Sequence, residues 1–189
     1  MVSFDTRDMK GNEWTELHFD HIGGNIVYDY EVFARVLSIE VSDNMEKTTK
    51  EEFTRKSATE FEYALDQNGN VMKDTAGNDI KIFKDVTATL VKTEKSKTCV
   101  IRGEVETISL FGEPKGSLAK VPFSSDSKFD NVSYEIIGNP EALTPEQRKL
   151  ARTEELPFPT ESVLVKQCIE NAKPVVRDIV LDSGNRFVK

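Results

Sequence analysis

Two short segments of this sequence carry side chains that commonly bind metal ions, and the first lies near the N-terminus. His18, Asp20 and His21 bring two imidazoles and a carboxylate together, and both groups are frequent zinc ligands. A zinc site needs further ligands, and none follows at a recognisable spacing. Gly23-Gly24 also interrupts any helix that would align the histidines. The sequence therefore favours an N-terminal arm over residues 1–24, with the metal site as the alternative.

The second segment has oxygen-bearing side chains at alternating positions, a pattern that suits calcium. These residues are Asp66, Asn68, Asn70 and Asp74. A calcium loop of the EF-hand type requires Gly at its sixth position and Glu at its twelfth. Here those positions hold Val71 and Gly77, so a hairpin turn is favoured instead. Asn68-Gly69 predicts a type I′ turn, because both residue types tolerate positive φ.

Other reactive groups lack a recognisable motif. The chain contains no nucleophile elbow, no P-loop and no dinucleotide-binding glycine pattern. Its two cysteines, Cys99 and Cys168, lie in apolar segments and are interpreted as buried free thiols. A disulfide between them remains open, since it requires Cα atoms within roughly 7 Å of each other. No cofactor is expected.

The charge balance excludes several partners. The formal net charge is −8, and a surface of this sign repels nucleic-acid phosphates and anionic membranes. No run of about 18 apolar residues exists, so no membrane span is expected. The N-terminus lacks a signal-peptide pattern. The chain is therefore either cytoplasmic or an extracytoplasmic protein whose signal has been removed.

Alternating apolar and polar residues predict mainly β-structure. Strands are expected over 26–41, 53–65, 80–92, 98–110, 118–124 and 129–137, and in 37–41 the alternation is that of a half-buried strand. Residues 86–93 and 98–105 are predicted to form a hairpin around Lys95-Ser96. In this register Val86 faces Val105 and Leu90 faces Ile101, with all four on one side. No internal repeat is apparent.

Helical signals appear only in the last third of the chain. Thr144-Pro145 predicts a short helix to about Arg152. A long helix should begin near Thr160 or Ser162 and stop at Gly184. Its expected apolar face is Val165, Cys168, Ile169, Ala172, Val176, Ile179 and Val180. The predicted fold is α+β: a mainly antiparallel β-sheet with a short helix and a long C-terminal amphipathic helix packed on it, as a single domain over 25–189.

Four segments carry a resemblance to a known group of proteins. They are residues 63–71 (YALDQNGNV), 74–78 (DTAGN), 129–132 (FDNV) and 138–143. In this order the chain resembles uncharacterised bacterial envelope proteins, which are often lipoproteins. The resemblance implies an envelope location and brings no catalytic residues with it.

The function expected from the sequence is a non-catalytic binding or structural module of the bacterial cell envelope. One alternative is a hydrolase whose carboxylates or histidines come together only in the fold. Another is a cytoplasmic subunit that pairs with another protein through a sheet edge. The segment from Glu46 to Glu62, rich in Lys, Glu and Thr, is the candidate for such an edge, although an ordinary solvated strand gives the same pattern.

Overall fold

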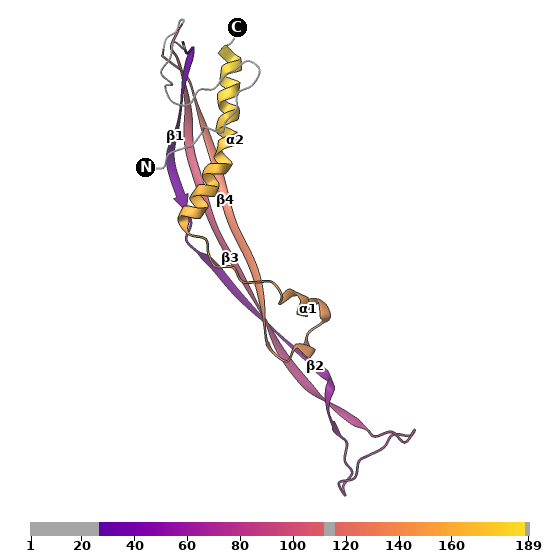
Figure 1. Ribbon diagram of the computed structural model, residues 1–189. Helices are drawn as coiled ribbons and strands as arrows, with labels where there is room; N and C mark the ends of the chain where they lie inside the picture. Colours follow the sequence, from indigo (N-terminus) through magenta and orange to yellow (C-terminus); the bar gives the residue numbers. More distant parts are fainter. Residues whose placement is uncertain (1–26, 112–115, 188–189) are drawn as a thin grey trace. The chain divides into compact units, whose positions relative to one another are not determined.

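The computed structural model describes residues 27–111 and 116–187, and within the last helix it describes side chains up to Ser183. The elements follow one another as β1 (Tyr30–Val41), β2 (Met45–Tyr63), β3 (Lys81–Ser109), β4 (Gly116–Gly138), η1 (Pro140–Ala142), α1 (Pro145–Leu150) and α2 (Glu161–Phe187). The predicted class is confirmed: an antiparallel sheet, a short helix and a C-terminal helix (Figure 1). None of the helices in these residues is both long and apolar enough to span a membrane.

The long strand β3 organises the sheet. β2 pairs antiparallel with its first half and β1 with its second half, while β4 also pairs with β3. Pro122 lies within β4, where a missing N–H is tolerated at a sheet edge. A bulge between Val36 and Ser38 turns Leu37 outward, leaving it 65% exposed within the segment expected to be half-buried.

The predicted hairpin around Lys95-Ser96 is wrong. β3 continues through this point without a turn, and Leu90 lies opposite Glu51 while Ile101 lies opposite Ile39. Lys95-Ser96 contains no Gly, Pro, Asn or Asp, the residues that favour a turn most strongly, so the local signal for a turn is weak. The strands expected over 118–124 and 129–137 are likewise one strand, β4.

The buried positions of β3 change parity along the strand. Val86, Ala88 and Leu90 are buried at even positions, whereas Cys99, Ile101 and other odd positions are buried further along. Successive side chains of a strand point to opposite faces. A change of parity is therefore a pattern that a turn also gives, although β3 is unbroken here.

The chain divides into two compact units. Unit 1 comprises Met1–Asn44, Lys97–Phe129 and Phe158–Lys189, and unit 2 comprises Met45–Ser96 and Asp130–Pro157. The strands β3 and β4 contribute residues to both units. The expected arm over 1–24 lies outside the described residues.

The core of unit 1 forms where α2 packs on the sheet. α2 contributes Leu164, Cys168, Ala172 and Val176, and the sheet contributes Cys99, Ile101, Val105 and Phe123. The predicted face of the helix is confirmed in part, but it omits Leu164, which is fully buried. α2 also runs past Gly184 to Phe187, so the expected stop there is wrong.

Unit 2 has a smaller core of its own. Leu143 is fully buried beside Ala142, against Val86, Ala88 and Leu90 of β3. The turn that carries Leu143 leads directly into α1, which begins with the capping box formed by Thr144 and Gln147. The short helix predicted from Thr144-Pro145 is therefore confirmed.

Candidate functional site

The segment around Asp66 and Asp74, for which the sequence favours a hairpin turn over a calcium loop, forms two tight turns in the connection between β2 and β3 (Figure 1). In the first turn, Asp66 Oδ1 accepts the N–H groups of Asn68 at 2.8 Å and Asn70 at 2.9 Å. Its second oxygen accepts Asn70 Nδ2 at 3.2 Å. Asp74 makes the equivalent three bonds to Ala76 and Asn78 in the second turn. Each carboxylate therefore organises its own turn.

These bonds lower the pKa of both carboxyl groups. The N–H of Asn70 has the largest effect on the pKa of Asp66, and the N–H of Asn78 has the largest effect on that of Asp74. Within the described residues, no three His, Cys, Asp or Glu side chains are grouped as a metal site. His18, Asp20 and His21 lie outside those residues.

The turn type differs from the expected type I′. Gly69 N–H donates to Asp66 O, so Gln67 and Asn68 are the central residues, and Gly69 follows with a φ of 84°. These bonds and the glycine at positive φ match the usual three-residue hairpin loop, in which a type I turn is followed by a left-handed glycine. Gly77 repeats the arrangement in the second turn with a φ of 83°.

The two turns form an internal repeat that the sequence analysis missed. Residues 66–70 (DQNGN) and 74–78 (DTAGN) share Asp, Gly and Asn at the same spacing. Three backbone bonds link the residues around them: Ala64 N–H to Ile80 O, Ile80 N–H to Met72 O, and Met72 N–H to Ala64 O. The signal was present as D-x-x-G-N occurring twice, eight residues apart.

Next to these turns lies a cluster of aromatic side chains on one face of the hairpin. Phe61 pairs across the strands with Phe83, at a ring separation of 5.9 Å, and packs edge-on against Tyr63 at 5.4 Å. The ammonium of Lys81 lies 4.1 Å from the Phe61 ring centroid, a cation–π contact. Tyr63 is 44% exposed and Phe83 is 38% exposed.

Further apolar side chains around the cluster are also exposed. We call the whole group the hairpin-end surface; it consists of Phe61, Tyr63, Leu65, Val71, Met72, Ile82 and Phe83. Leu65 and Ile82 are 57% and 58% exposed, and Leu65 forms an isolated bridge with Val71. Ile82 pairs with Glu62, so its side chain lies on the face opposite Phe61, Tyr63 and Phe83. Exposed large apolar side chains concentrated at one end of a hairpin are of the kind that marks interaction sites.

A hydrogen-bonded clamp holds β2 just before the hairpin-end surface. Between Lys56 and Phe61, β2 carries extra residues relative to β3, which form a bulge. Glu141 of η1 accepts hydrogen bonds from Ser57 Oγ at 2.7 Å and Thr59 Oγ1 at 2.9 Å within this bulge. The bond from Ser57 is the main cause of the lowered pKa of Glu141. The bulge is therefore fixed to the core of unit 2.

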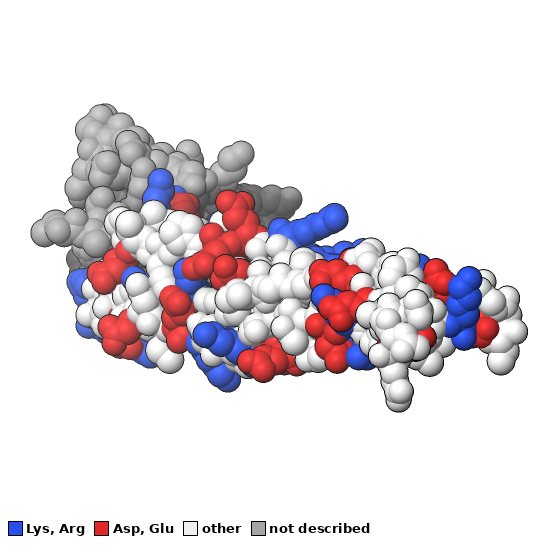
Figure 2. Space-filling model, turned by 90° about the horizontal axis from the view of Figure 1, so that it is seen from below, with Lys and Arg blue, Asp and Glu red and all other residues white. Residues whose placement is uncertain are grey.

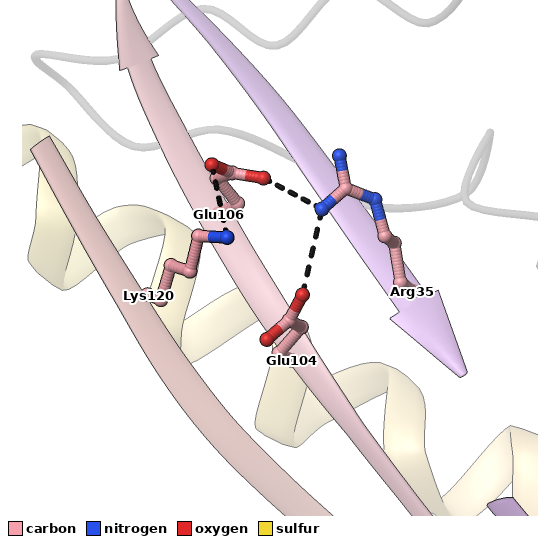
Figure 3. Close-up of polar contacts among 4 residues, drawn as sticks. All are labelled: Arg35, Glu104, Glu106 and Lys120. Carbon is pink, nitrogen blue, oxygen red and sulfur yellow. Dashed lines mark hydrogen bonds and ion pairs between the residues drawn. The ribbon is translucent and has the colours of Figure 1, made fainter. Parts of the chain in front are cut away.

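A second polar group crosses three strands of unit 1, on the face of the sheet away from α2 (Figure 3). Arg35 of β1 binds Glu106 of β3 at 2.6 Å through one oxygen and Glu104 at 3.4 Å. Lys120 of β4 lies 3.5 Å from the other oxygen of Glu106. The side chain of Glu106 is only 9% exposed, so its charge is nearly buried and doubly paired.

The Glu106 carboxyl should make the stability of the chain depend on pH. Hydrogen bonds from Ser117 and Arg35 lower its pKa in the folded chain. The ionised form thus stabilises the folded state above the pKa of the unfolded chain, and this contribution is lost as pH falls through the folded value. Thermal melts between pH 7 and pH 3 should therefore show a smaller acid-induced fall in Tm for Glu106→Gln, together with a lower Tm at pH 7.

Glu52→Gln provides the control for this prediction, because Glu52 is an exposed glutamate on β2. Its melts should follow those of the unmodified chain at every pH. A Glu106→Gln variant with an unchanged Tm at pH 7 and an unchanged acid slope would show that the cluster contributes nothing to stability.

Unit 2 also has an open concavity of about 410 Å³. Met45 and Val132 line it together with Lys47, Glu94 and Lys95. Two of the charges are already paired: Lys95 with Glu155, and Glu94 with Lys92. In the face seen in Figure 2, acidic and basic side chains are interspersed with uncharged ones. Met45 and Val132 are the apolar residues of a lining that is otherwise charged or polar.

One free edge of the sheet in unit 2 belongs to β2. Among the described strands it pairs only with β3, which makes the predicted edge segment an edge strand. Its first half, from Met45 to Glu52, is exposed throughout and rich in charge, a common protection of edges. The hairpin-end surface lies at the other end of the same strand. The unpaired backbone groups at the edge of β2 therefore lie on the same strand as Phe61 and Tyr63 of the hairpin-end surface.

Comparison of the chain with protein-family models, with curated proteins and with solved structures gives no match.

Proposed function

We propose that this protein is a non-catalytic binding module of the bacterial cell envelope, and that it binds another protein through the hairpin-end surface and the adjoining edge of β2. The observation that carries the proposal is the exposure of several large apolar side chains, Leu65, Ile82 and Tyr63 above all, on a hairpin anchored to its unit. Burying these side chains against a partner removes apolar area from water, at roughly 25 cal/mol per Å².

The mode of binding that suits this surface is addition of a strand. A partner strand that pairs with the free edge of β2 near Tyr63 would satisfy backbone groups and extend the aromatic face of Phe61 and Phe83. Lys81 beside that face favours a partner with a carboxylate near its apolar residues. The envelope location rests on the resemblance of residues 63–71 and 74–78 described above.

Site-specific photo-cross-linking in bacterial cells tests the proposal. A photoreactive residue at position 65 should give a protein adduct in the envelope fraction, whereas one at position 156 should not. Leu156 is the matched control, since it is 45% exposed and lies in the same unit. The adduct at 65 should disappear when Tyr63 and Phe83 are both changed to Ser, and circular dichroism should show that this variant keeps the folded spectrum.

Three results would count against the proposal. Equal adducts at positions 65 and 156 would show that the hairpin-end surface is not a specific binding site. Adducts confined to the cytosolic fraction would favour a cytoplasmic subunit instead. Turnover in a panel of hydrolase substrates by the purified chain would show that the module is catalytic.

A further inference from the structure

The only two cysteines of the chain meet in the core of unit 1. Cys99 lies on β3 and Cys168 on α2, 69 residues apart, and both are fully buried in the same cluster. Cys168 Sγ lies 3.6 Å from the carbonyl oxygen of Cys99 and 3.2 Å from that of Ser125. The two residues are therefore in direct contact, as two residues joined by a disulfide must be.

The helix holds Cys168 firmly in this position. Ser125 Oγ of β4 donates a hydrogen bond to the backbone oxygen of Cys168 at 3.0 Å. The Cys168 thiol in turn donates to the backbone oxygen of Ser125, so two hydrogen bonds join these residues. Leu164 and Ala172, one turn to either side on α2, are buried in the same core. Little freedom remains for the two sulfurs to move apart while the unit is folded.

We propose that Cys99 and Cys168 are a disulfide couple, that the thiols seen here are its reduced form, and that a disulfide oxidant joins them while the chain folds. The thiolate of one cysteine attacks an external disulfide such as oxidised glutathione and releases one glutathione thiolate. The second cysteine, as thiolate, then attacks the mixed disulfide and releases the second glutathione. Two thiols are oxidised to one disulfide, and one oxidised glutathione is reduced to two thiols.

Burial decides when this reaction takes place. In the folded chain, burial is the main cause that raises the pKa of Cys99 to about 11, and contact with Cys168 adds to it. The thiolate is the nucleophile in thiol–disulfide exchange, so the folded, reduced chain reacts slowly. Oxidation therefore takes place during folding, while both thiols are still exposed to solvent. Once formed, the buried bond is out of reach of external reductants, and no third cysteine offers a wrong partner.

Refolding of the full chain with glutathione tests the couple independently of the proposed function. The reduced, unfolded chain is refolded in excess oxidised glutathione with a small amount of reduced glutathione, then quenched with acid. We expect a mass lower by two hydrogen atoms and no thiol titratable in denaturant. Relative to the chain refolded without oxidant, Tm should rise on the order of 10 °C, because the bond closes a long loop.

The single variants Cys99→Ala and Cys168→Ala are the matched controls and should carry one glutathione adduct and no internal bond. If either variant fails to fold, the comparison of the oxidised and reduced unmodified chain still decides the matter. Two free thiols after refolding, glutathione adducts on the unmodified chain, or a lower Tm after oxidation would each overturn the proposal and leave the pair as packing residues.

Discussion

Replacing Gly103 with Ala is expected to destabilise unit 1 by about 3 kcal/mol or more, at the upper end for overpacked cores. A Cβ at this position would lie 2.4 Å from Cζ of Phe123 and 2.4 Å from the backbone oxygen of Arg35. The ring of Phe123 is nearly buried and cannot swing away freely. The backbone of β1 cannot move without disturbing its pairing with β3. Both neighbours therefore resist the added methyl group.

Urea unfolding followed by circular dichroism measures the effect. Ser124→Ala, an exposed change next to Phe123 on β4, is the control and should stay within about 0.5 kcal/mol of the unmodified chain. In the Gly103→Ala background, Phe123→Leu should recover part of the loss, because it removes the ring atoms but not the contact with Arg35. A Gly103→Ala variant as stable as the control would contradict the close packing of β1, β3 and β4.

The second large effect is expected from truncating the fully buried leucines of the two cores. Leu164→Ala in unit 1 and Leu143→Ala in unit 2 should each cost about 2–5 kcal/mol, through lost burial and a residual cavity. Ile169 and Ile179, on the predicted face of the helix, are only partly buried and should cost less than Leu164. Leu164 thus identifies the centre of the contact between α2 and the sheet.

The exposed neighbours Val163 and Leu150 provide the controls, since they are 46% and 40% exposed. Their changes to Ala should alter the free energy of unfolding by less than about 0.5 kcal/mol in the same urea titrations. A Leu143→Ala variant that matches Leu150→Ala would show that η1 does not close a core in unit 2. The same comparison between Leu164→Ala and Val163→Ala tests whether α2 packs on the sheet through Leu164.

Local signals in the sequence predicted the parts of the fold that depend on neighbouring residues. Thr144 with Gln147 defines the start of α1, and the apolar spacing of residues 165–180 defines α2. The turns were located because Gly69 and Gly77 each adopt a conformation that other residues avoid. In each case the cause lies within a few positions of the effect, so a single sequence is sufficient.

The continuity of β3 could not be predicted in the same way. Its 29 residues far exceed the usual length of a strand, and a parity change in the middle is the pattern that a hairpin also gives. What keeps the strand extended is that β2 occupies its first half and β1 its second. The group of Arg35, Glu104, Glu106 and Lys120 depends on the same distant pairing, so its members carry no local signal.

The repeated turn allows the connection between β2 and β3 to change in length by fixed steps. Residues 66–73 form one complete step, because Ala64, Met72 and Ile80 occupy equivalent places eight residues apart. Removing residues 66–73 would join Leu65 to Asp74. Ala64 and Ile80 would then face each other directly, and an ordinary antiparallel pair would replace the ring of three backbone bonds. Gain or loss of such a step changes the number of turns that extend from this ring without altering the pairing of β2 and β3. Related chains can therefore differ in length at this point while retaining the same sheet.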